Sequence, residues 1–190
     1  MKYVNDEYSA TYEEKKSKFI AHLCAYEKFD EVMKRLKEEH PKGRHHVYAY
    51  RYLNEYSQIV ENSSDDGEPK GTSGKPSLHV LAGNELINSA VIIVRYFGGI
   101  KLGTGGLVRA YGDAVNLVIS KATLHEYKKL EQKSLACSYS ELSKIEYMLQ
   151  NASVTVLKKE FEQDVILHLE ASSQEFIQLE EILPRHLKLT

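Results

Sequence analysis

The sequence predicts a two-domain α+β protein. Candidate helices and strands follow one another along most of the 190 residues, and 42% hydrophobic residues are enough for packed cores. From Lys128 onward the candidate elements come in the order strand, helix, strand, strand, helix, strand, which is typical of a ferredoxin-like domain. We therefore expect one domain over residues 1–126 and a second over residues 127–190.

The first elements are predicted by hydrophobic periodicity. In Phe29–His40 apolar residues recur at helical spacing, and Pro41 and Gly43 end the segment. In His45–Leu53 apolar or aromatic residues alternate with others. In order, we expect a strand over Lys18–Tyr26, a helix over Phe29–His40, and a hairpin of His45–Leu53 with Gln58–Asn62.

Two polar, glycine-containing segments follow, separated by a short helix and a strand. Residues 62–76 are too rich in turn residues for regular structure, and a short helix should then carry Pro76 in its first turn and Gly83 near its end. Ser89–Phe97 is an almost continuous apolar run, which favours a buried central strand. The second segment, Gly98–Gly106, opens into a helix whose apolar face is Leu107, Tyr111, Ala114, Val115, Val118 and Ala122.

The second domain is predicted from shorter signals. Ser140 is a candidate cap for a helix carrying Leu142, Ile145 and Leu149, and Ser172 to Glu175 has the spacing of a capping box. The strands are expected over Leu130–Tyr139, Ser153–Lys158, Asp164–Glu170 and His186–Thr190.

Glycines and cations gather in one part of the chain. Ten of the eleven glycines lie between Gly67 and Gly112, although turns alone would scatter them. Between Pro69 and Gly112 five cations stand against a single anion, Glu85, whereas the whole chain has a net charge of -2. Glycine loops beside cations and a helix N-terminus can bind anions through their backbone amides. The predicted anion or nucleic-acid site comprises Lys70, Lys75, Arg95, Gly98, Gly99, Lys101, Thr104, Gly105 and Arg109.

The known nucleotide motifs are not met. Gly98 and Gly103 have the gap of a phosphate-binding loop, but Thr104-Gly105 replaces the required Lys-Ser/Thr, and the dinucleotide pattern lacks its third glycine. The alternative interpretation is a set of tight turns with ordinary surface charge.

Acid–base chemistry has weaker support. His45, Asp65, Asp66 and Glu68 are candidates for proton transfer, or for fixing the loop through a salt link to Lys75 or Arg95. His45 and His46 are neighbours on a strand and face opposite ways, so they cannot chelate one metal ion together. No nucleophile motif is present. We therefore expect no catalytic residue, no metal and no cofactor.

Two segments resemble the hallmark of the IMPACT family, whose bacterial branch is called the YigZ type. They are Asp65-Asp-Gly-Glu-Pro-Lys-Gly-Thr-Ser-Gly-Lys-Pro76 and Val94-Arg-Tyr-Phe-Gly-Gly-Ile-Lys-Leu-Gly-Thr-Gly-Gly-Leu-Val-Arg-Ala-Tyr-Gly112. The resemblance implies an N-terminal ribosomal-protein-like β-α-β two-layer sandwich and a C-terminal ferredoxin-like domain similar to a module of elongation factor G. It also implies a link to translation control, because eukaryotic relatives are associated with damping the amino-acid-starvation stress response.

Three functions follow as expectations. The first is a non-catalytic module that binds RNA or the ribosome, and the second is an enzyme acting on a small phosphorylated or carboxylated substrate in a deep pocket. The third is an adaptor that binds a protein partner through an apolar patch on the C-terminal sheet. Two separated cysteines, Cys24 and Cys137, and the lack of an apolar signal segment favour free thiols, a cytoplasmic location and no membrane partner.

Overall fold

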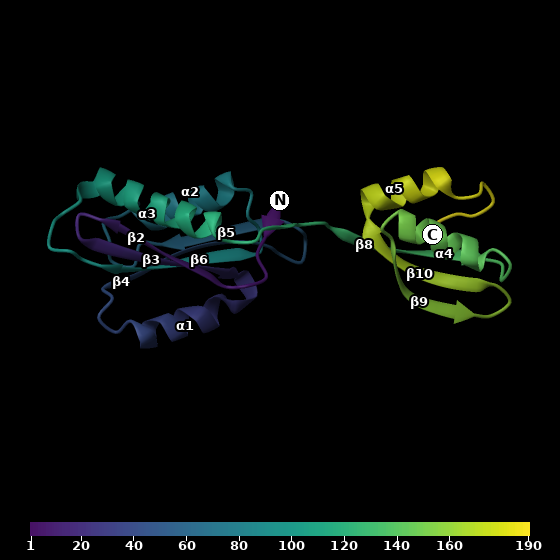
Figure 1. The fold of residues 1–190 in the computed structure, drawn as a ribbon, viewed down its shortest axis with the longest axis horizontal. Helices are drawn as coiled ribbons and strands as arrows, with labels where there is room; N and C mark the ends of the chain where they lie inside the picture. Colours follow the sequence, from purple (N-terminus) through teal and green to yellow (C-terminus); the bar gives the residue numbers. More distant parts are fainter. The chain divides into compact units, whose positions relative to one another are not determined.

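The computed structural model describes residues 1–190 and divides into two compact units, Met1–Tyr127 and Lys128–Thr190 (Figure 1). The division lies one residue from the boundary expected between residues 126 and 127. Both cysteines are free and buried. No helix is both long and apolar enough to cross a bilayer.

A five-stranded antiparallel sheet forms the first unit, in the order β2-β3-β6-β4-β5. The strands are β2 (Tyr8–Glu14), β3 (Ser17–Ala25), β4 (His45–Leu53), β5 (Ile59–Ser64) and β6 (Ser89–Tyr96), and a separate two-stranded pair joins β1 (Lys2–Tyr3) to β7 (His125–Glu126). The expected central strand is therefore confirmed as β6. Strand β2 was not expected, because its residues are mostly polar and it lies at the sheet edge.

Helices cover both faces of this sheet (Figure 1). A short 3-10 turn, η1 (Tyr26–Lys28), leads into α1 (Phe29–Glu39) on one face, and α2 (Gly74–Gly83) with α3 (Gly103–Ser120) covers the other. Alternate residues of β6 serve the two cores: Val91 and Ile93 pack with α2 and α3, whereas Ile92 packs with α1. The sheet with α2 and α3 forms the expected two-layer sandwich, and α1 adds a third layer on the opposite face.

The second unit has the ferredoxin-like order. It consists of β8 (Leu130–Cys137), α4 (Leu142–Asn151), β9 (Thr155–Phe161), β10 (Val165–Ser172) and α5 (Ser173–Ile182), with sheet order β8-β10-β9. Leu189 forms an isolated bridge with Leu135 of β8, so the expected last strand is reduced to one bridge. The capping box of Ser172 and Glu175 is present at α5, but Ser140 does not cap α4, which follows Glu141.

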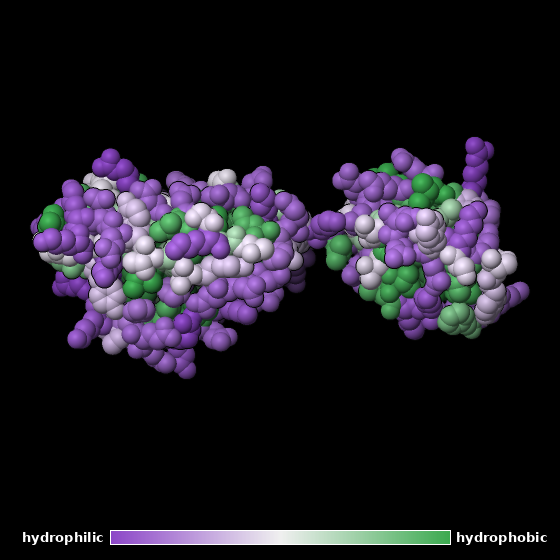
Figure 2. All heavy atoms as spheres, in the orientation of Figure 1, coloured by the Kyte–Doolittle hydropathy of each residue, from purple (hydrophilic) through white to green (hydrophobic).

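The two faces of the C-terminal sheet differ in burial. The buried residues of β10, Val165, Leu167 and Leu169, belong to the core cluster that includes residues of α4 and α5. The intervening positions, Ile166, His168 and Glu170, pair with Ala136, Ser134 and Gln132 of β8. These open-face positions mix apolar and polar side chains, and Leu157 and Phe161 of β9 are exposed on the same unit, so the protein partner expected at this sheet stays a prediction. The face of the molecule drawn in Figure 2 is mainly hydrophilic, with apolar patches on both units.

Candidate functional site

The first glycine loop, residues 65–73, is shaped by the carboxylate of Asp65. Its oxygens accept hydrogen bonds from the backbone N–H groups of Gly71, Ser73 and Gly74 at 2.7, 3.1 and 2.8 Å, and from the Ser73 hydroxyl at 2.8 Å. The amides of Ser73 and Gly74 lie at the start of α2, where N–H groups lack intrahelical acceptors. Burial opposes ionisation of Asp65, but the hydrogen bonds outweigh burial and lower its pKa. Asp65 therefore fixes the loop.

Asp66 joins this loop to the beginning of β4. Its Oδ2 accepts a hydrogen bond from the His46 backbone N–H at 2.5 Å, and its carbonyl oxygen lies 2.7 Å from His45 Nδ1. A carbonyl oxygen only accepts, so Nδ1 of His45 carries a proton and donates. The other ring nitrogen, Nε2, lies 3.9 Å from Glu68 Oε1. His46 points the opposite way, with Nε2 at 3.4 Å from the Leu36 carbonyl of α1.

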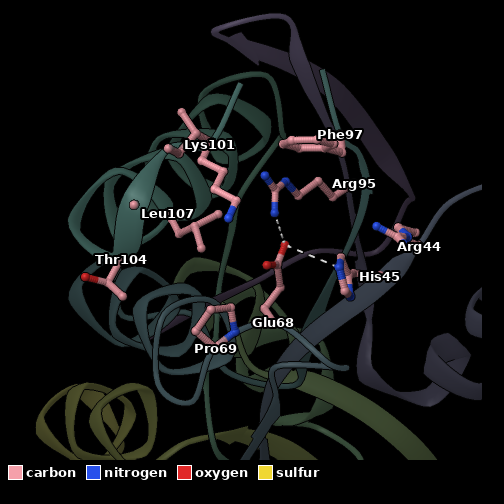
Figure 3. Close-up of a pocket in the computed structure, with 11 residues that line it drawn as sticks. Arg44, His45, Glu68, Pro69, Arg95, Phe97, Lys101, Thr104 and Leu107 are labelled. Atoms are coloured by element: carbon pink, nitrogen blue, oxygen red, sulfur yellow. Dashed lines mark hydrogen bonds and ion pairs between the residues drawn. The ribbon is translucent and has the colours of Figure 1, made fainter. Parts of the chain in front are cut away.

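Glu68 is a buried carboxylate that connects three elements. Its Oε1 accepts a hydrogen bond from Arg95 Nη1 of β6 at 2.5 Å (Figure 3). The same oxygen accepts a hydrogen bond from the Tyr111 hydroxyl of α3 at 2.8 Å. The Arg95 guanidinium also lies 5.4 and 5.7 Å from the ring centres of Phe19 and Phe97. Burial, and then the charge of Glu68, raise the pKa of Tyr111, so its hydroxyl remains a donor. Two uses were predicted for the acids of this loop, proton transfer and a salt link that fixes the loop. Glu68 forms the salt link, with Arg95 as its partner.

A pocket of about 430 Å³ lies between the first glycine loop and the second, residues 97–102 (Figure 3). Its walls hold three cations and one carboxylate, and the Lys101 amine points toward Arg95 and Glu68. The start of α3 also lines it, and the first N–H groups of a helix have no intrahelical partner and carry partial positive charge. The lining residues are Arg44, His45, Glu68, Pro69, Arg95, Phe97, Lys101, Leu102, Gly103, Thr104 and Leu107.

The structure brings together only part of the predicted cation cluster. Arg95 and Lys101 line the same pocket, but Arg95 is buried and engaged by Glu68, so it is not the free anion ligand that we expected. Arg109 lines a different hollow of about 210 Å³, so the three cations do not converge on one anion. Lys70 and Lys75 are exposed and line neither cavity.

The predicted glycines have different roles. The Gly98 N–H donates to the Ser17 hydroxyl at 3.1 Å, and a Cβ at Gly98 would lie 2.0 Å from the Lys16 carbonyl carbon. Gly98 therefore allows close backbone packing, and its amide is not available to a ligand. Gly99 and Gly105 do not line the pocket, whereas Thr104 does.

Several pocket residues were not predicted as site residues from the sequence, among them Arg44 and Phe97. Arg44 precedes His45 directly, but it lies outside the segment in which the charges were counted. Phe97 was assigned to the end of a buried strand, yet the residue is 47% exposed and lines the pocket. No group of three or more His, Cys, Asp or Glu side chains is placed to hold a metal ion.

Fold and site together define a two-domain α+β protein with a basic pocket built by glycine loops at one sheet end. A family model described as the Impact N-terminal domain matches residues 15–119, and a domain of unknown function, DUF1949, matches residues 135–181. An IMPACT family member of Haemophilus influenzae is 36% identical over 165 residues, which cover 84% of this chain and 79% of the relative.

Other relatives agree with this match. The IMPACT family member YigZ of Escherichia coli is 37% identical over 158 residues, which cover 82% of this chain and 78% of YigZ. A crystal structure described as that of a hypothetical protein has a TM-score of 0.63 and 31% identity, covering 99% of this chain and 95% of that one. The chain belongs to the IMPACT family.

Proposed function

We propose that this chain is a non-catalytic translation regulator that binds RNA, free or in the ribosome, through the pocket and the cations around it. The observation that carries the proposal is the charge of the pocket, where three cations face one carboxylate that Arg95 and Tyr111 already engage. Such a surplus of positive charge favours phosphate groups.

Arg44 and Lys101 are the cations available to a ligand. Both are exposed, and neither forms an ion pair within the protein. Lys70, Lys75 and Arg109 are also exposed and widen the basic surface. The N–H groups at the start of α3 supply further donors beside Lys101.

Membership of the IMPACT family connects this surface with translation. The resemblance associates eukaryotic relatives with control of translation during amino-acid starvation, and RNA is the polyanion on which translation acts. A basic pocket in a chain of net charge -2 indicates a local phosphate-binding surface instead of general attraction to polyanions.

The test is a charge-removal variant, Arg44→Gln with Lys101→Gln, titrated with a fluorescent single-stranded RNA at several salt concentrations. We expect roughly tenfold weaker binding at low salt and a salt dependence that is shallower by about 1.4 in the slope of log K against log salt. The matched control is Lys34→Gln with Lys37→Gln, which removes two exposed, unpaired cations from α1. Wild-type affinity in the first variant would contradict the proposal.

A second candidate, an enzyme for a small phosphorylated or carboxylated substrate, is favoured by the mixed apolar and charged lining of the pocket. Pro69, Phe97 and Leu107 supply apolar wall beside the charged groups. Because Asp65 and Asp66 are engaged in the loop, His45 is the group left for proton transfer, with Nε2 toward the pocket.

Thermal shift with inorganic phosphate and nucleoside monophosphates separates the two candidates. A saturable rise in melting temperature that Lys101→Gln abolishes, without RNA affinity in the wild type, would favour the small ligand. RNA affinity without any such rise would favour the regulator.

A further inference from the structure

The turn between β2 and β3 has an unusual sequence for its conformation. The two strands are joined by only two residues, Lys15 and Lys16, and both have positive φ angles, 46° and 64°. Two-residue hairpin turns with positive φ at both positions strongly favour Asn-Gly, because side chains with a bulky Cβ are strained there. Two lysines at this turn therefore indicate that something other than turn stability selects them.

The turn is fixed beside the second glycine loop. The Gly98 backbone packs against Lys16, and the Gly98 N–H donates to the hydroxyl of Ser17, the first residue of β3. Register places this end of the sheet together, because Arg95 pairs with both Phe19 of β3 and His45 of β4. The β2–β3 turn thus lies at the sheet end that carries the pocket.

The two lysines face hollows on either side of this sheet end. Lys15 lines the hollow of about 210 Å³ together with Arg109. Two carboxylates, Glu14 and Asp113, also line this hollow, and both lie within 3.5 Å of the Tyr12 hydroxyl. Lys16 lines another hollow, of about 470 Å³, with Lys18.

The charge around the second of these hollows is unbalanced. Its other lining residues, Ile20, His40 and Tyr96, include no carboxylate. Both turn lysines are exposed, and neither forms an ion pair, so they present free charge. Positive charge therefore continues from Arg44 and Lys101 to the turn and Lys16, whereas Lys18 is paired with Glu13 at 3.4 Å.

We propose that the Lys15–Lys16 turn is a phosphate-contacting arm of the RNA-binding surface. It holds the part of the RNA that adjoins the nucleotides in the pocket. The inference rests on the proposed function and extends it to the opposite side of the second glycine loop. The two lysine amines, held on a fixed backbone, contact phosphates of one RNA strand. The strained turn is kept because its two lysines supply this charge.

Replacement of the turn by its preferred sequence, Lys15→Asn with Lys16→Gly, tests the inference. This variant removes two charges and relieves backbone strain, so its melting temperature should equal or exceed that of the wild type. Its affinity for short single-stranded RNA at low salt should fall several-fold, and its salt slope should be shallower by about 1.4. Lys15→Arg with Lys16→Arg should keep wild-type affinity, as should Lys34→Gln with Lys37→Gln.

The outcomes separate the inference from the proposed function. If Arg44→Gln with Lys101→Gln weakens RNA binding but the Asn-Gly turn binds as wild type, the arm is wrong and the pocket surface stands. If the wild type binds no RNA, both are overturned. Loss of affinity in the Asn-Gly turn with unchanged stability supports the arm, because a purely structural turn would not lose binding when its strain is relieved.

Discussion

The carboxylate of Glu68 and the guanidinium of Arg95 form an internal ion pair, with Oε1 2.5 Å from Nη1 and side chains only 3% and 8% exposed. The pair joins the first glycine loop to the end of β6, and Tyr111 adds α3 through a hydrogen bond to the same oxygen. The wall of the pocket is therefore preorganised by groups that neutralise one another. The cations left for a ligand are the exposed Arg44 and Lys101.

Arg95→Met should destabilise the first unit strongly. It leaves the Glu68 carboxylate buried with only the Tyr111 hydroxyl as a donor, and removal of one partner of a buried pair costs about 3–5 kcal/mol. Urea unfolding, with hydrogen exchange of β6 amides to identify the transition of this unit, measures the loss. The double variant Glu68→Gln with Arg95→Met should regain part of it, because no buried charge is then unpaired. Equal stability of the single variant and the wild type would contradict this account.

Asp65→Asn should loosen the first glycine loop. Both carboxylate oxygens accept N–H groups, so an amide would set its own NH₂ against at least one donor, at a cost of about 1–2 kcal/mol. The pKa of Asp65 is lowered in the folded state, so its stabilisation is complete above the ordinary value of 3.8 and is lost as pH falls through the folded pKa.

The pH profile of unfolding checks this prediction. The difference in unfolding free energy between wild type and Asp65→Asn should be constant near neutral pH and shrink below about pH 3.8. Asp6→Asn, at an exposed position without a side-chain hydrogen bond, is the control. A difference that grows on acidification would exclude the proposed role of the carboxylate.

Much of the fold could be predicted because its signals are local. The apolar run of β6 and the capping box of α5 are specified by neighbouring residues. Strand β2 was missed because its hydrophobic signal is weak and its pairing, such as Tyr8 with Leu23, depends on the rest of the sheet.

The candidate site was predicted less completely than the fold. The sequence identified both glycine loops, but charge sign alone does not say whether a cation faces a ligand or an internal carboxylate. Arg95 was therefore assigned to the ligand, although its link to the loop acids was the stated alternative. Lys15 and Lys16 carry no sequence signal at all, because their positive φ angles and the packing of Lys16 against Gly98 arise only in the folded chain.

Gly98→Ala should be far more harmful than Gly105→Ala. A Cβ at Gly98 would meet the backbone of Lys16 and Ser17 at 2.0–2.4 Å, which no side-chain movement can relieve, so we expect a loss of about 1–3 kcal/mol. Gly105 lies in α3, and a Cβ there meets nothing within 4 Å, so alanine should stabilise the helix by up to about 1 kcal/mol.

Thermal unfolding of the two glycine variants measures this contrast directly. Because Gly98→Ala also pushes the Lys15–Lys16 turn away from the second glycine loop, it should weaken RNA binding under conditions where the variant is folded. Gly105→Ala should leave that binding unchanged, since Gly105 lines neither the pocket nor the adjoining hollows. Equal melting temperatures for the two variants would mean that the turn and the loop are not packed against each other as the structure has them.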